Sequence, residues 1–126
     1  MEQRENIIQV HDLRKSYGDL KAVDGISFGV SAGEVFGILG PNGAGKTTTV
    51  EILEGMRAPD SGIAVVNGID VQKDPRAVKE IIGIQLQSSA FFDRLSLVEI
   101  LDVMASLYHR QIDALVLLRD VELDDR

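Results

Sequence analysis

Eight consecutive residues, Gly40 to Thr47, combine three glycines with a lysine ammonium group and a threonine hydroxyl. They read Gly-Pro-Asn-Gly-Ala-Gly-Lys-Thr, which fits the phosphate-binding pattern of glycine, four variable residues, glycine, lysine and threonine or serine. In such a loop the backbone N–H groups surround the phosphates, the lysine approaches the β- and γ-phosphates, and the hydroxyl binds Mg²⁺. The sequence therefore predicts a site for a nucleoside triphosphate with Mg²⁺.

The residues of this loop have separate predicted roles. Glycine permits tight backbone bends, and the start of a helix after the loop adds a partial positive charge. A glycine-rich loop without a ligand is the alternative, but it would leave the match to this pattern to chance. We expect the nucleotide to be bound by Gly40, Asn42, Gly43, Ala44, Gly45, Lys46, Thr47 and Thr48, with Lys46 also acting in catalysis and Thr47 binding the metal.

The segments on either side of the loop have the pattern that it requires. Residues 34–39 form a short apolar run after a Ser31-Ala32-Gly33 turn, which is typical of a buried strand. Residues 46–56 contain no proline and can place apolar side chains on one side of a helix. A strand that turns into a helix around a phosphate is therefore predicted.

Other apolar runs place this unit in an α/β fold. Residues 7–13 and 23–30 are predicted strands, and residues 63–71 form a predicted hairpin around Asn67-Gly68. Asp74 followed by Pro75 indicates the start of a short helix to about residue 81. Residues 82–86 are a further predicted strand.

Two helices are expected in the last third of the chain. Ser96 and Glu99 have the spacing of a capping box, with Leu95 and Ile100 placed as its hydrophobic staple. The helix that follows has an apolar face, and residues 111–119 predict a second helix. The chain reads as a single domain, with a β subdomain and phosphate-loop core over about 7–95 and the start of a helical subdomain over 96–126.

The composition is that of a protein that works outside the lipid bilayer. The 126 residues include no cysteine, and no apolar stretch approaches the ~20 residues of a membrane span. A formal net charge of −7 without a basic cluster argues against nucleic acid as a partner. The N-terminus lacks the apolar segment of a signal peptide. A cytoplasmic location is expected.

Three elements in order resemble the nucleotide-binding domain of ABC-type ATPases, from about Ile8 to the last residue. Tyr17 and Gly18 stand where that family has its adenine-stacking aromatic loop, and residues 40–48 resemble the phosphate loop of the family. Gln87 resembles the Q-loop glutamine, although Leu86 replaces the usual proline and a slip to Gln85 is an open alternative. The resemblance implies a P-loop core with an N-terminal antiparallel β subdomain, and ATP with Mg²⁺ as ligands.

The resemblance also implies roles for two side chains outside the loop. The Tyr17 ring would stack on the adenine, whereas a lone tyrosine here would otherwise be a packing or turn residue. Gln87 would act in catalysis near Mg²⁺ and the attacking water, whereas without the resemblance it is a solvated loop residue. Phe91 and Phe92 are core residues or contacts for a membrane partner. His11 and His109 are ordinary surface residues.

Several family elements do not occur in the sequence. It has no Leu-Ser-Gly-Gly-Gln signature, no apolar strand ending in Asp-Glu, no D-loop and no switch histidine. Residues 116–120 have apolar residues before an acid, but Arg119 interrupts them. We expect an N-terminal part of an ABC-type domain, shortened by engineering or by its reading frame, that binds ATP without turning it over. Its isolated stability is expected to be marginal, because apolar faces would stay uncovered.

The expected function is to energise transmembrane export, most like the drug- and antibiotic-export branch. Expected partners are transmembrane permease subunits and a second nucleotide-binding domain, at the inner face of the membrane. A non-catalytic nucleotide-binding or regulatory module is the alternative. A different P-loop class, such as a small GTPase or a nucleotide kinase, is disfavoured because the sequence has no Asn-Lys-x-Asp guanine motif.

Overall fold

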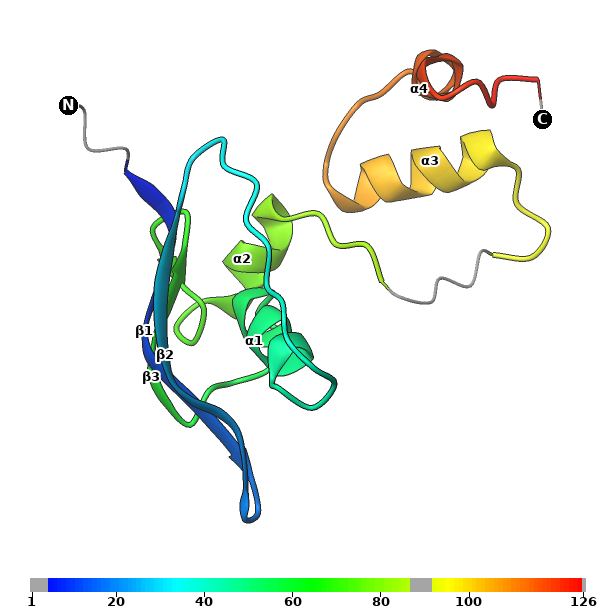
Figure 1. Ribbon diagram of the computed structural model, residues 1–126. Helices are drawn as coiled ribbons and strands as arrows, with labels where there is room; N and C mark the ends of the chain where they lie inside the picture. The colour runs from blue at the N-terminus through cyan, green and yellow to red at the C-terminus, as the bar shows by residue number, and fades with distance from the viewer. Residues whose placement is uncertain (1–4, 87–91, 126) are drawn as a thin grey trace. The chain divides into compact units, whose positions relative to one another are not determined.

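The computed structural model describes residues 5–86 and 92–125, and it divides into two compact units, Met1–Ile84 and Gln85–Arg126. Within the described residues it has both strands and helices (Figure 1). The elements in chain order are β1 (Asn6–Tyr17), β2 (Leu20–Ser31), α1 (Lys46–Leu53), β3 (Ser61–Val66), β4 (Ile69–Asp70), α2 (Pro75–Ile81), α3 (Leu97–Leu107) and α4 (Ala114–Asp120).

The first unit is built on a sheet in which every pair is antiparallel, in the order β2-β1-β3-β4. This confirms the predicted antiparallel β subdomain. Both long strands extend beyond their predicted limits, because the ladder continues to the pair Tyr17 and Leu20 beside the turn. Gly18 supports that turn with a left-handed φ of 58°.

Helices α1 and α2 lie against one face of this sheet (Figure 1). The core between them contains three fully buried side chains, Leu13 from β1, Ile52 from α1 and Val78 from α2. Valines from the strands complete it, among them Val23 of β2. Burial of these aliphatic side chains holds the two helices on the sheet.

The local signals for turns and caps are confirmed. Asn67 and Gly68 both have positive φ, 48° and 78°, as a two-residue hairpin turn of the primed type requires. The Asp74 side chain accepts a hydrogen bond from the N–H of Ala77 at 3.0 Å, with Pro75 in the first turn of α2. These signals succeed because each is satisfied by neighbouring residues.

Two predicted strands are wrong. Residues 34–39 and 82–86 have no strand hydrogen bonding within the described part of the chain. In the first segment the side chains of Val35 and Leu39 are 100% and 95% exposed. A strand obtains its backbone hydrogen bonds from a neighbouring strand, and no described strand lies beside either run. Helix α1 also ends at Leu53 rather than near residue 56, because Gly55 turns left-handed with φ 68°.

The second unit consists of α3 and α4, which pack on each other. The capping box of α3 is confirmed: Ser96 and Glu99 exchange both side chain-to-backbone hydrogen bonds. Helix α4 starts after Asp113, whose carboxylate accepts hydrogen bonds from two backbone N–H groups. Residues 116–120 are therefore helical and do not form an apolar strand that ends in an acidic residue. Within the described residues, no helix has the length and apolar content needed to cross a bilayer.

Replacement of a core leucine tests this arrangement. We expect Leu13→Ala to lower the free energy of unfolding by about 2–5 kcal/mol, because it leaves a cavity where no solvent now reaches. Leu20→Ala is the matched control, since Leu20 is 63% exposed, and it should change the free energy of unfolding by less than about 1 kcal/mol. Urea denaturation followed by circular dichroism measures both. Similar losses in the two variants would contradict the described core.

Candidate functional site

The phosphate-binding pattern occupies the connection into α1. Its last glycine, Gly45, is the N-cap of α1 with a left-handed φ of 83°, and it has no side chain to cap the helix. The first turn of α1 also contains no acidic residue. The N–H groups and the partial positive charge at this helix start are therefore not neutralised by a carboxylate of the helix itself, as an anion site requires.

Close contact with the sheet fixes the position of this loop. A Cβ atom at Gly45 would lie 2.0 Å from the carbonyl oxygen of Ala22 on β2. The loop backbone therefore rests directly on the backbone of β2, and only glycine allows this approach. At Gly43 the φ is also left-handed, 84°, but a Cβ there would meet open space.

The Lys46 side chain folds back over the loop. Its ammonium group donates hydrogen bonds to the carbonyl oxygens of Gly40 and Pro41, at 2.5 Å and 2.7 Å. At Gly40, one of the predicted nucleotide-binding residues, a Cβ atom would come within 3.3 Å of the Ala44 methyl group. The positive charge thus lies within the loop, so the residues present fit a phosphate group.

Three consecutive threonines follow Lys46 at the start of α1, and they differ in burial. Thr47, the predicted metal ligand, is exposed, and Thr48, a predicted nucleotide-binding residue, is half-buried. Both lie in the first turn of the helix. Thr49 is buried, and its hydroxyl donates to the Gly45 carbonyl oxygen at 2.8 Å. The phosphate-binding pattern does not include this third threonine, although helical threonine hydroxyls often donate to the carbonyl oxygen four residues back. Asn42 and Ala44 are exposed in the loop.

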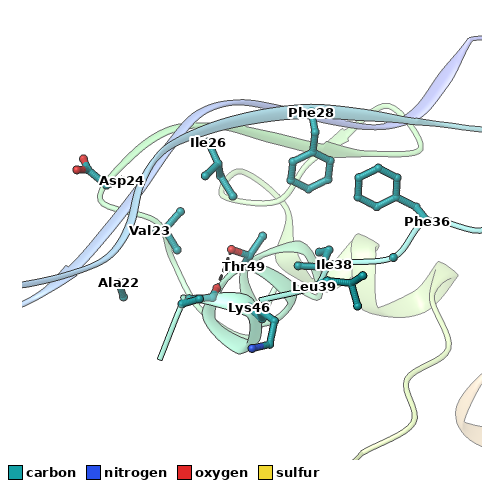
Figure 2. Close-up of a pocket in the computed structure, with 13 residues that line it drawn as sticks. Ala22, Val23, Asp24, Ile26, Phe28, Phe36, Ile38, Leu39, Lys46 and Thr49 are labelled. Carbon is teal, nitrogen blue, oxygen red and sulfur yellow. Dashed lines mark hydrogen bonds between the residues drawn. The ribbon is translucent and has the colours of Figure 1, made fainter. Parts of the chain in front are cut away.

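A pocket of about 370 Å³ lies beneath the loop, between β2 and residues 36–39 (Figure 2). The rings of Phe28 and Phe36 stack at one end, with centroids 5.2 Å apart. Lys46 and Thr49 line the pocket where α1 starts. Most of its lining is apolar, and Ala44 and Gly45 of the loop also line it, so the pocket adjoins the point where the loop contacts β2.

Tyr17 lies at the end of β1, close to the loop along the sheet. It pairs with Leu20, which lies two residues before Ala22 on β2. Since a strand advances about 3.3 Å per residue, the Tyr17 backbone is roughly 7 Å along the strand from the carbonyl that meets Gly45. The Tyr17 side chain is 41% exposed, and two cationic groups that the sequence analysis missed, on Lys15 and Arg57, lie over its ring.

The predicted glutamine is not placed by the structure. Gln87 and Phe91 lie outside the described residues, and the alternative Gln85 is exposed in a segment without regular structure. Phe92 is exposed, contrary to its interpretation as a core residue. The structure therefore gathers the residues from 40 to 48 at the start of α1, with Tyr17 nearby, and leaves the role of the glutamine a prediction.

Comparison with known sequences gives consistent matches. A sequence profile described as ABC transporter matches residues 23–126. The probable multidrug ABC transporter ATP-binding protein YbhF of Escherichia coli K12 is 36% identical over 104 residues, which cover 82% of this chain and 18% of that protein. The doxorubicin resistance ATP-binding protein DrrA of Mycobacterium tuberculosis H37Rv is 47% identical over 91 residues, which cover 71% of this chain and 28% of that protein. The chain spans less than a third of the length of both relatives.

Solved structures share the fold. An ATP binding subunit of an ABC transporter matches with a TM-score of 0.81 and 27% identity, over 95% of this chain and 52% of that chain. CbiO1 from Clostridium perfringens, part of the ABC transporter complex cbiONQ, matches with a TM-score of 0.57 and 32% identity, over 63% of this chain and 33% of that chain. The predicted fold class, a P-loop core with an antiparallel β subdomain and the start of a helical part, is thus confirmed.

Two glycine variants test the contact between the loop and β2. Gly43→Ala and Gly45→Ala impose similar left-handed strain, but only the second drives a methyl group into the Ala22 carbonyl. We expect Gly43→Ala to lower the free energy of unfolding by about 1–2 kcal/mol, and Gly45→Ala by clearly more. Urea denaturation of the two variants measures the difference. Equal losses would contradict the assigned contact.

Proposed function

Because the chain belongs to the ABC transporter family, we propose that it binds ATP with Mg²⁺ through the residues from Gly40 to Thr48. The observation that supports this most directly is the Lys46 ammonium group, which is held inside the loop at the uncapped start of α1. A cation and helix N–H groups at one place favour the triphosphate of a nucleotide.

Each residue has a proposed part in binding. Lys46 would exchange its carbonyl partners for the β- and γ-phosphates, and the loop N–H groups of Asn42, Gly43 and Gly45 would face the anion. The Ala44 N–H donates to the Pro41 carbonyl oxygen at 3.2 Å and would have to exchange that partner in the same way. Thr47 is exposed at the start of α1, where its hydroxyl would hold Mg²⁺, and the metal would offset charge on the phosphates. Tyr17 would stack on the adenine, and Gln87 would complete the metal environment.

The proposed biological role is to energise export across a membrane. Support comes from the relatives, since DrrA is named a doxorubicin resistance ATP-binding protein and YbhF a probable multidrug ABC transporter ATP-binding protein. We propose transmembrane permease subunits and a second nucleotide-binding domain as partners, with the chain held at the inner face of the membrane. The proposed domain is a single one, with parts at about 7–95 and 96–126. Both relatives are named as ATP-binding proteins, and neither name supports a separate regulatory module.

Removal of the lysine charge tests the phosphate site. We expect Lys46→Ala to weaken Mg-ATP binding about ten- to a hundredfold, because a charge-assisted hydrogen bond is worth roughly 1.5–3 kcal/mol. Lys79→Ala is the matched control, since Lys79 is exposed on α2, and it should leave the affinity unchanged. Isothermal titration calorimetry measures both. Unchanged ATP affinity in Lys46→Ala would contradict the assignment of Lys46 to the phosphate site.

Binding is expected without turnover in this chain. Phosphoryl transfer needs an acid for the metal and a group that orients the water, and the apolar run with an acid at residues 116–120 is helical. The pure chain should release phosphate from ATP no faster than its Lys46→Ala variant. A phosphate-release assay at saturating Mg-ATP makes the comparison. Release that is well above background and is lost in the variant would contradict this expectation.

A further inference from the structure

Two cations from different parts of the chain lie over the Tyr17 ring. The guanidinium carbon of Arg57 lies 5.4 Å from the ring centroid, and the ammonium nitrogen of Lys15 lies 5.6 Å from it. Both distances are within the ~6 Å over which a cation is attracted to an aromatic face. The tyrosine nevertheless keeps 41% of its surface exposed, so the two cations leave part of this residue accessible to a ligand.

A carboxylate holds each of these cations. The Nε of Arg57 lies 2.6 Å from an Oε atom of Glu51 on α1. The Nζ of Lys15 lies 2.9 Å from Asp60, whose other oxygen accepts the N–H of Ser16 at 2.7 Å. These contacts raise the pKa of Arg57, chiefly through the Glu51 hydrogen bond, and lower the pKa of Asp60, chiefly through the Lys15 hydrogen bond. The two cations are thus ordered parts of the surface around the ring.

Arg57 and Lys15 differ in what they connect. Lys15 lies only two residues before Tyr17 on β1, so it is a near neighbour of the ring along the chain. Arg57 follows α1 and is tied to that helix through Glu51, and α1 begins with the phosphate loop. Arg57 therefore links the ring to the helix that carries the loop. A planar guanidinium also suits stacking on an aromatic face better than an ammonium group does.

We propose that Arg57 is a positioning residue for nucleotide binding: held by Glu51, its guanidinium packs on the Tyr17 ring and fixes the orientation in which the ring stacks on the purine base. This inference rests on the proposed ATP site. In this proposal Arg57 affects the binding of the base and does not contact the phosphates. Because its Nε already bonds Glu51, the Arg57 guanidinium has a partner before the base arrives, which lowers the cost of ordering it on binding.

The chain has two tyrosines and no tryptophan, which provides a direct probe. In a Tyr108→Phe background, Tyr17 is the sole tyrosine, and quenching of its fluorescence reports stacking by the base. Titrations would use Mg-ATP, and calorimetric titrations would use inorganic tripolyphosphate with Mg²⁺, which has no base. Four further variants are compared in this background: Arg57→Ala, Arg57→Lys, Glu51→Gln and, as a control for charge, Arg76→Ala.

We expect Arg57→Ala to weaken ATP binding about three- to fivefold and to reduce the quenching, with tripolyphosphate affinity unchanged. Arg57→Lys and Glu51→Gln should give smaller losses in the same direction. Arg76→Ala removes the same charge from an exposed pair with Glu80 on α2 and should change neither affinity. Circular dichroism confirms that each variant keeps the parent fold.

The opposite outcomes are also informative. Unchanged or tighter ATP binding in Arg57→Ala would overturn the inference, and tighter binding would show that the guanidinium competes with the base for the ring. Equal losses for ATP and tripolyphosphate would overturn it as well, because they would place Arg57 with the phosphates. If the parent binds neither ligand, the proposed nucleotide site fails first, and the inference fails with it. If the parent binds both ligands and only the Arg57 result differs from expectation, the nucleotide site stands.

Discussion

The place of the phosphate loop depends on one backbone contact, that of Gly45 with the carbonyl oxygen of Ala22. Backbone atoms cannot change rotamer to relieve a clash, so this contact sets the distance between the loop and β2. Seven residues later, about two helical turns, Ile52 reaches the centre of the core. The start of α1 is thus fixed by backbone and its far end by aliphatic packing, and the N–H groups between them acquire a defined direction.

The same fold shows which elements a sequence determines and which it leaves to their neighbours. Helix starts at Asp74, Ser96 and Asp113 are closed by residues three or fewer positions away, and the Asn67-Gly68 turn depends on its own φ angles. Residues 34–39 have an equally clear apolar pattern, yet that pattern states only that burial is favourable. A strand also needs a second segment to provide its hydrogen-bond partners, and the apolar pattern of one segment does not show whether such a neighbour exists.

A similar distinction applies to the candidate site. The loop residues could be singled out from the sequence because their types and spacing match a phosphate-binding pattern, and their binding of a phosphate stays a prediction. The third threonine of α1 was missed, although its bond to the Gly45 carbonyl is local and could have been anticipated from helical geometry. Arg57 is different, because forty positions separate it from Tyr17 and no spacing rule relates them. Only the packing of the hairpin beside α1 brings the two together.

The lysine of the loop has a consequence for the energetics of any anion that binds there. Its ammonium group already donates to two carbonyl oxygens of its own loop. Anion binding is then an exchange of hydrogen-bond partners and not the gain of new ones, so the heat released will be smaller than the number of phosphate contacts suggests. The compensation is entropic, since a side chain that is already confined has less freedom to lose. Because the lysine is ordered during folding, anion binding at this loop releases less heat but also loses less side-chain entropy.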